Sequence, residues 1–363
     1  MNLFQKLFLL VSSLLFIISC STEPDSVGEI RTADLPGIEL NRIFTLDEPE
    51  GHFFEMITVI ETDSQHRIFL VDQRANQIYV YDSTGEFITT FGREGAGPDE
   101  FRGILRMRVD ENDRLLFYDR MNNRNVVYEV SDQTWTPVQF FRIEGTRFGV
   151  EAVGKNGNVI VRKSKNQRPE PGASWYVHEL AVAHLDSGIT SDRRVEFKEM
   201  GFLVTDDYSM SGIPFGRTTL LATGSDGKYY MVWNESFDVK IYDMNLNLID
   251  SVSANIPNVE VTQEERAKAL DSAGPVFRSL AAEHMPGTKP VASSLKVDPK
   301  GNFWVQTFDD PEYVVLNSDG EPIGSFDLSG ENERILHISS DRVYTVNSGG
   351  DGYEISVYEY SLN

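Results

Sequence analysis

The sequence has almost no cysteine, since Cys20 is the only one among 363 residues. A single thiol excludes a disulfide framework and a cysteine-ligated metal centre within the chain, so a large apolar core must stabilise the fold. Positive charge is also scarce, because 33 lysines and arginines stand against 56 acidic residues for a net charge of −23. This balance repels nucleic acid and anionic lipid headgroups, and we therefore expect no nucleic-acid partner.

The short motifs of several enzyme classes are missing as well. The sequence contains no G-x-S-x-G, no H-E-x-x-H and no Walker loop. Its six histidines form no cluster of metal ligands along the chain, and His178 and His184 are best interpreted as ordinary strand positions on one face. These absences leave open whether the chain is an enzyme and favour a protein without catalytic activity.

Long apolar runs are missing too. The stretch at residues 7–18 is about a dozen residues long, whereas a membrane-spanning helix needs about twenty. It follows Lys6 and ends in Ile-Ile-Ser-Cys, which resembles the lipobox of bacterial lipoproteins. We expect residues 1–19 to be a signal peptide and Cys20 to carry the lipid that anchors the protein, through this lipid only, in the cell envelope. The alternative is a plain secretory signal followed by a chance cysteine.

The segment after the cysteine is polar and contains Pro24 and Pro36. We interpret residues 20–37 as the lipidated N-terminus and a flexible tether that holds a folded domain, residues 38–363, off the membrane. The domain is expected to be a monomer on the periplasmic side of the outer membrane or at the cell surface.

An internal repeat of about fifty residues follows. Each copy has an apolar strand, a polar loop, an alternating strand, a turn and a third strand, and one further strand precedes it across an Asp-, Asn- or Gly-rich turn. Four antiparallel strands per unit at this period are typical of the blades of a β-propeller. The four clearest copies are residues 68–91, 115–140, 229–252 and 303–326.

The count of repeats predicts an all-β, six-bladed β-propeller. We place the blades at residues 54–92, 101–143, 147–198, 214–254, 290–328 and from 334 onward. The last blade has only three strands before the chain ends, whereas Leu40–Leu46 is a spare strand near the N-terminus. We therefore predict that this strand completes the sixth blade and closes the ring.

One segment departs from the repeat. Thr262 and Glu265 form a capping box, a helical run continues to Ala273, and Gly274-Pro275 interrupts it before the helical period resumes. The sequence therefore predicts a helical insertion at residues 262–285, between blades four and five.

The segment at residues 92–101, GREGAGPDEF, resembles the inter-blade motif of the bacterial six-bladed β-propeller lipoproteins, a family related to the NHL-repeat proteins. The resemblance implies an exported propeller in which Phe101 packs between neighbouring blades. It implies no particular reaction, and fold analogy alone says little about function.

Strand direction predicts where a ligand site lies. When the strands a, b, c and d of a blade alternate in direction, the a–b and c–d turns share one face and the b–c and d–a loops share the other. The second set is longer and richer in arginine, which binds carboxylates and stacks on rings. The candidate ligand-binding residues are Arg74, Arg93, Arg120, Arg124, Arg217, Trp233 and His52. The alternative is that these arginines pair with acidic residues and clamp adjacent blades together.

Two functions remain open at this stage. The first is a binding or scaffold module that recognises a glycan, a peptide or a protein partner through the long-loop face. The second is a metal-dependent lactonase- or lyase-like hydrolase, for which Asn41, Glu55 and Glu151 are available as ligands. No cofactor is expected, although calcium at residues 110–113 or 309–310 is the alternative to ordinary turn chemistry at these acidic segments.

Overall fold

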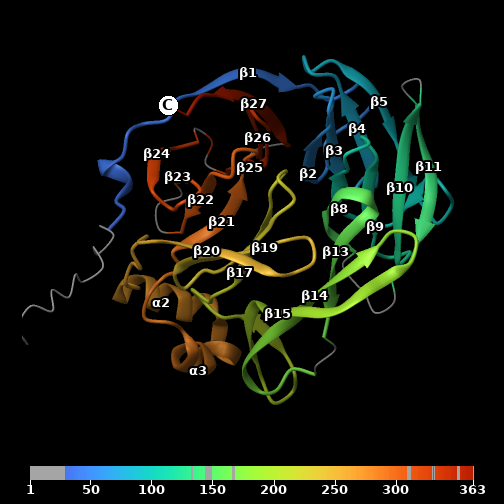
Figure 1. Cartoon of the computed structure of the whole chain (residues 1–363). Coiled ribbons are helices and arrows are strands. Elements are labelled where there is room, and N and C mark those ends of the chain that lie inside the picture. The colour runs from blue at the N-terminus through green and yellow to red at the C-terminus, as the bar shows by residue number, and fades with distance from the viewer. Residues whose placement is uncertain are drawn as a thin grey trace, which may run out of the picture.

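The computed structural model describes residues 29–131, 134–143, 149–165, 168–308, 312–328, 330, 332–349 and 352–362. Within these ranges, five antiparallel sheets of four strands and one of five are arranged as blades around a centre (Figure 1). The first strands of neighbouring blades contact one another, so these strands line the centre of the ring. The predicted all-β six-bladed propeller is confirmed.

The first three blades have their strands in sequence order from the centre outward. Blade 1 contains β2 (Ile57–Thr62), β3 (Ile68–Asp72), β4 (Gln77–Tyr81) and β5 (Phe87–Phe91). Blade 2 contains β8 (Ile104–Val109), β9 (Leu115–Asp119), β10 (Arg124–Ser131) and β11 (Thr134–Phe141). Blade 3 contains β12 (Val150–Val153), β13 (Asn158–Ser164), β14 (Gly172–His184), β15 (Gly188–Val204) and β16 (Met210–Gly212).

Blades 4 and 5 repeat this order, and blade 6 takes its outer strand from the N-terminal part of the chain. Blade 4 contains β17 (Thr219–Thr223), β18 (Tyr229–Trp233), β19 (Phe237–Tyr242) and β20 (Leu248–Ala254). Blade 5 contains β21 (Ala292–Val297), β22 (Phe303–Thr307), β23 (Tyr313–Leu316) and β24 (Pro322–Phe326). Blade 6 contains β25 (Glu333–Ile338), β26 (Arg342–Asn347), β27 (Glu354–Tyr360) and β1 (Leu40–Leu46).

The ring is closed by the pairing of β1 with β27. The two strands run antiparallel, with Leu40 opposite Tyr360 and Leu46 opposite Ile355. Figure 1 shows the N-terminal strand, in blue, lying along the C-terminal one, in red. The predicted closure is confirmed, and it gives β27 a hydrogen-bonded neighbour in place of an open edge.

The core is divided among the spaces between blades. Six clusters of buried apolar side chains each join two successive blades around the ring. Phe101 is fully buried in the cluster between blades 1 and 2, where its ring meets that of Phe117 edge-on. This confirms its predicted position, and burying a side chain of this size contributes about 1.5–3 kcal/mol to stability.

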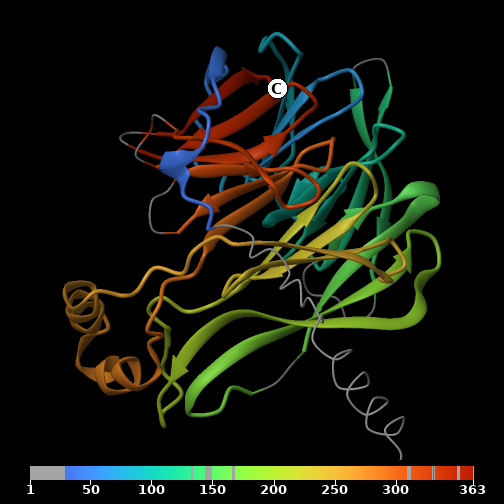
Figure 2. The same cartoon turned by 60° about the vertical axis from the view of Figure 1, so that its left-hand side comes forward.

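Blade 3 and the helical insertion depart from the regular repeat. The hairpin of β14 and β15 extends past residue 198, the predicted end of blade 3, and β16 adds a fifth strand to the sheet. The insertion forms α2 (Gln263–Ser272) and α3 (Gly274–His284), and Thr262 caps α2 as predicted by accepting from the Glu265 backbone N–H. Figure 2 shows both helices to one side of the ring, where α3 contacts the long hairpin.

The segment expected to be a tether is partly attached to the propeller. Ile30 is buried in the cluster between blades 4 and 5, and its backbone N–H donates to the Asn255 carbonyl at 2.8 Å. The Pro36 carbonyl accepts from the Ser325 backbone N–H at 2.9 Å. Because Ile30 anchors the chain to the propeller, a free tether can extend only to about residue 29 and not to residue 37 as predicted. Cys20 and the predicted signal peptide lie outside the described residues.

Candidate functional site

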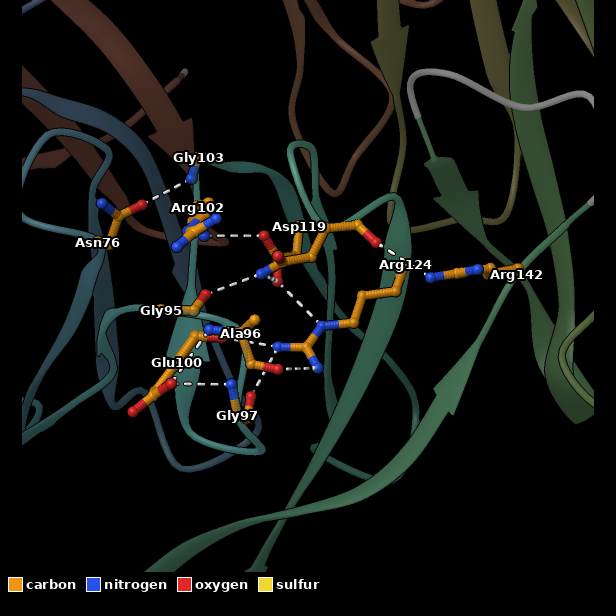
Figure 3. A network of polar contacts seen from close by, with 11 residues as sticks. Asn76, Gly95, Ala96, Gly97, Glu100, Arg102, Gly103, Asp119, Arg124 and Arg142 are labelled. Carbon is orange, nitrogen blue, oxygen red and sulfur yellow. Dashed lines mark hydrogen bonds and ion pairs between the residues drawn. The ribbon is translucent and has the colours of Figure 1, made fainter.

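Arg124, one of the predicted ligand-binding residues, instead joins the inter-blade loop to blade 2 (Figure 3). It lies at the start of β10 and pairs through Nε with the Asp119 carboxylate at 2.9 Å. Its Nη2 donates to the carbonyl oxygens of Gly97 and Glu100 at 2.8 and 2.6 Å. The guanidinium is thereby occupied by backbone and carboxylate oxygens.

Arg93 has a similar role at the other end of the same loop. Its Nη2 lies 2.9 Å from Glu100 Oε1, and Glu100 Oε2 accepts from the Gly97 backbone N–H at 2.9 Å. The Gly97 hydrogen bond, followed by the one from Arg93, lowers the pKa of the Glu100 carboxyl. Gly92 has φ +94°, and a Cβ there would lie 2.7 Å from the Asn76 carbonyl oxygen, so the loop requires glycine at this point.

The remaining candidates are spread around the loop face. Arg217 is buried and donates to the Thr288 carbonyl and hydroxyl oxygens, Trp233 donates to a carboxylate, and the His52 ring lies edge-on to Tyr79. Arg74 and Arg120 are exposed, and their side chains have no hydrogen-bond partner among the described residues.

The donors of Arg93, Arg124 and Arg217 are engaged within the protein, but none of the three pairs with an acidic residue of an adjacent blade as the alternative of inter-blade clamps predicts. No observation tests whether the loop face binds a ligand, so that assignment stays a prediction.

A cavity of about 940 Å³ lies on the opposite face, at the centre of the ring. It opens where the first strand of each blade ends, among the a–b turns, and every blade contributes to its wall. The residues that line it are Met244 and residues within the segments 61–66, 108–111, 152–158, 221–228, 295–299 and 336–340. None of the seven predicted residues belongs to this lining.

Four polar side chains from three blades meet on one side of this cavity. Arg108 Nη1 lies 3.0 Å from Glu61 Oε1, and the second oxygen of Glu61 lies 3.5 Å from His337 Nδ1. Thr62 Oγ1 is 3.0 Å from His337 Nε2. Burial lowers the pKa of His337, and Lys296 and Arg108 lower it further against the opposing effect of Glu61. The group therefore contains a carboxylate, a guanidinium and an imidazole held by one another.

A second ion network connects blades 2 and 3. Arg106 and Arg162 both pair with the buried carboxylate of Glu151, and Arg162 also pairs with Glu199. His178 Nε2 lies 2.8 Å from Glu199 Oε2. Burial raises the pKa of Glu199, but the hydrogen bond from His178 and the charge of Arg162 outweigh it and bring the pKa down to about 2.

The backbone of β8 is strained at the residue that enters this network. Arg106 has φ +55°, which is a left-handed backbone conformation that residues other than glycine rarely adopt. The register between β8 and β9 shifts between Leu105 and Arg108, so the residue lies in a β-bulge. Such a conformation costs about 1–3 kcal/mol and is concentrated at functional sites. The bulge places two arginines, Arg106 and Arg108, in ion pairs at the centre of the ring.

Lys296 is the cavity lysine supplied by β21. Its Nζ donates to the Leu336 carbonyl oxygen at 2.9 Å, and no carboxylate among the described residues pairs with it. Burial, followed by the charge of Arg108, lowers the pKa of Lys296 to about 8, while Glu61 opposes the shift. An ammonium group therefore lies in the wall of the cavity with unused donor capacity.

The balance of charge on the six first strands is opposite to that of the whole chain. The six first strands carry four lysines and arginines, which are Arg106, Arg108, Lys296 and Arg334, and three carboxylates, which are Glu61, Glu151 and Glu333. Glu333 is turned into its own sheet, where it accepts from the hydroxyls of Thr345 and Tyr358. These six strands thus carry one more cation than carboxylates in a protein of net charge −23, whereas the cavity lining, which includes the a–b turns, contains five carboxylates and four lysines and arginines.

The residues considered for a metal site do not come together. Asn41 lies on β1, the outermost strand of blade 6, Glu55 is exposed before β2, and Glu151 is paired with two arginines. No group of three or more His, Cys, Asp or Glu among the described residues could hold an ion.

The acidic turn at residues 110–113 has a structural role. Asp110 accepts from the Asn112 backbone N–H and from Arg114 Nε, and Asp113 accepts from the hydroxyl of Ser64. Residues 309 and 310 lie outside the described residues.

The cavity residues were not predicted, because loop length and arginine content both point to the opposite face of the ring. A usable signal was present in the first strands, where charged residues interrupt otherwise apolar runs such as ILRMRV and ERILHI. Such an interruption in a buried strand indicates either a paired charge or a site.

Residues 45–143 match the model of a family described as 6-bladed beta-propeller. A solved structure of a protein from Bacteroides fragilis, described as exported, is 11% identical, has a TM-score of 0.57, and is matched over 90% of this chain and 95% of that one.

A member of the DUF4221 family from Bacteroides vulgatus is 10% identical with a TM-score of 0.54, over 90% and 99% of the two chains. At these identities the likeness concerns the fold alone. A search of curated protein sequences found no match.

No helix among the described residues has the length and apolar character needed to cross a bilayer. The predicted resemblance to the bacterial six-bladed β-propeller family is confirmed, and the described chain has the fold of that family.

Proposed function

We propose that this chain is an exported binding protein, anchored by lipid on Cys20, that holds a small polar ligand in its central cavity. The observation that carries the proposal is the cavity of about 940 Å³ with charged groups from several blades in its wall. Sites for small molecules are typically cavities of about 300–1,000 Å³ in which a few polar groups converge.

The polar groups of the cavity favour recognition over catalysis. Glu61 in the cavity wall is paired with Arg108, and Glu151, which lies on the first strand of blade 3 outside the lining, is paired with two arginines. Rigid, mutually held groups of this kind suit a site that orients a ligand. The alternative of a metal-dependent lactonase- or lyase-like hydrolase is favoured by no observation on the described residues.

The shape of the site narrows the ligand classes that the sequence left open. A cavity at the centre of a ring admits a small glycan or the end of a peptide, whereas a folded protein partner would contact only its rim. A glycan or a peptide is therefore the class of ligand that the cavity fits best.

A screen by thermal shift tests the location of the site. Purified protein is screened against a panel of oligosaccharides and short peptides, and each hit is repeated with Thr223→Trp, which narrows the cavity from β17, a strand without charged residues. The double variant Arg74→Glu/Arg120→Glu alters the loop face at two exposed side chains. We expect the first variant to abolish the shift and the second to leave it unchanged. The opposite pattern would return the site to the loop face.

The lipid anchor is tested separately. Cells that express the full chain are fed an alkyne analogue of palmitate, and the label is detected on the protein. We expect labelling of the natural chain and none of Cys20→Ala, which should leave the membrane fraction. Labelling that persists in the variant would contradict the assignment.

A further inference from the structure

The geometry points to a small organic anion as the ligand of the central cavity, with its carboxylate or phosphate group bound by Lys296. This inference rests on the proposed function and adds the chemical class of the ligand. The observation behind it is a lysine in the cavity wall whose only hydrogen-bond acceptor among the described residues is a backbone carbonyl.

The carboxylates near Lys296 are already engaged. Glu61 is held by Arg108 at 3.0 Å, and Glu333 accepts from two hydroxyl groups within blade 6. Neither lies in an ion pair with Lys296. An ammonium group has three donors, of which the Leu336 carbonyl takes one, so two remain for a ligand.

The surroundings of Lys296 favour negative charge in the ligand. Arg108 and Arg334 both act on it as cations, and only Glu61 acts as an anion. The neighbouring strand β17 carries no ionisable residue, and the one carboxylate that blade 4 adds to the cavity lining, Asp226, is paired with Lys228 at 2.8 Å. An anion placed here interacts favourably with three cationic groups, Lys296, Arg108 and Arg334, in a site of reduced dielectric.

The rest of the cavity indicates an organic ligand rather than a simple ion. The volume of about 940 Å³ far exceeds that of a phosphate, and the lining includes apolar groups of Leu221, Ala222 and Leu295 alongside the polar ones. A monosaccharide acid or a peptide carboxyl terminus combines the required charge with a body that fills the remaining space.

Binding of an anion has a consequence that can be measured. The charge of the ligand stabilises the protonated form of Lys296, so its pKa must rise from about 8 when the complex forms. At pH 8 the protein therefore takes up a fraction of a proton. The other ionisable groups near Lys296 are Glu61, Arg108, Arg334 and His337. Of these four, only His337 has an ordinary pKa close enough to 8 to contribute to the proton uptake.

Calorimetric titrations test the ligand class. Galacturonate and glucuronate are titrated into the folded protein at pH 8 in two buffers of different ionisation enthalpy, with galactose and glucose as uncharged counterparts and inorganic phosphate as a competitor. We expect the acids to bind with proton uptake and the neutral sugars not to bind. Phosphate should compete weakly.

Two variants of Lys296 separate its charge from its packing. Lys296→Met should weaken binding of the acids by at least about tenfold, because a charge-assisted hydrogen bond is lost. Lys296→Arg should retain binding but lose the part of the proton uptake that belongs to this residue, since arginine stays charged at pH 8. The matched control is Lys300→Met, a change at an exposed lysine on the a–b turn of the same blade, and it should have no effect.

The outcomes distinguish this inference from the proposed function. One outcome is that neutral sugars or uncharged peptides are instead the ligands that bind, with Thr223→Trp blocking them and Lys296→Met not. In that case the assignment of an anionic ligand is wrong, and the cavity remains the site. If the acids bind equally to Lys296→Met and to the natural protein, Lys296 is not the recognition group. If no probe binds and Thr223→Trp changes nothing for any ligand found in the screen, the proposed function fails as well.

Discussion

The guanidinium of Arg108 and the carboxylate of Glu61 join two blades across the edge of the central cavity, with Nη1 and Oε1 3.0 Å apart. Arg108 also donates through Nε to the Glu151 carbonyl oxygen at 2.9 Å, so one side chain from β8 connects blades 1, 2 and 3. Both members of the pair are less than one-quarter exposed, and their interaction is therefore only partly screened by water.

A double-mutant cycle measures how strongly this pair is coupled. Arg108→Met and Glu61→Gln should each lower the free energy of unfolding, and the coupling between them should be about 1–3 kcal/mol, because contacting charged groups are not additive. Urea unfolding of the four proteins provides the measurement. If the two effects on the free energy of unfolding add within about 0.5 kcal/mol, the contact between Arg108 and Glu61 contributes no stability of its own.

The clamp formed by Arg124 gives a second prediction. Arg124→Met should destabilise the protein by about 3 kcal/mol, because it removes the partner of the buried Asp119 and releases two backbone carbonyl groups. Arg120→Met is the matched control at an exposed position of the same blade, and it should change stability by no more than about 0.5 kcal/mol. Equal effects of the two changes on the thermal midpoint would contradict the clamp.

Lys296 predicts how stability depends on alkaline pH. Its pKa is about 8 in the folded protein and 10.5 for a lysine side chain in water, so between these values the unfolded chain binds more protons and stability rises with pH. Lys296→Met should remove this rise and should increase stability at pH 7 by up to about 3 kcal/mol.

Denaturant unfolding of both proteins between pH 7 and 10.5 checks this prediction, and only the difference between the two curves is assigned to Lys296. Parallel curves would show that the lysine is not desolvated. Lys300→Met should reproduce the curve of the natural protein.

Glu199 predicts the response to acid. Its pKa is about 2 in the folded protein against 4.5 for a glutamate side chain in water, so its stabilising effect is complete above pH 4.5 and disappears as the pH falls towards 2. Glu199→Gln should therefore be less stable than the natural protein at pH 7 and should approach it in stability at pH 2–3. Thermal midpoints at pH 7, 4.5 and 3 provide the test. A constant difference across this range would rule out the ion network with Arg162 and His178 as its source.

The ring was predictable from the sequence because its signals are local. Alternating strands, Asp- and Gly-containing turns and a constant period define each blade, and the missing strand after β27 left Leu40–Leu46 as the only spare partner. Ile30 was overlooked because a single apolar residue in a polar segment has no period, although blades 4 and 5 bury it.

The site was not predictable in the same way. The arginines of the loop face were predicted as a site from their residue type. The partners of Arg124, however, include backbone carbonyl oxygens of a loop whose path depends on Gly92 at positive φ. Conversely, the direction of Arg106 depends on a bulge that breaks the two-residue alternation of β8. No periodic pattern in the sequence indicates which way such a side chain points.

Protection of Lys296 from chemical labelling tests the central claim most directly. Folded protein is treated at pH 8 with a trace of acetic anhydride, with and without saturating galacturonate, and acetylation of each lysine is quantified by peptide mass spectrometry. We predict that galacturonate slows acetylation of Lys296 several-fold, because the ligand covers its Nζ and keeps it protonated, while the exposed Lys300 reacts at an unchanged rate. Equal acetylation of Lys296 with and without the acid, under conditions where calorimetry shows binding, would contradict binding of the ligand's anionic group by Lys296.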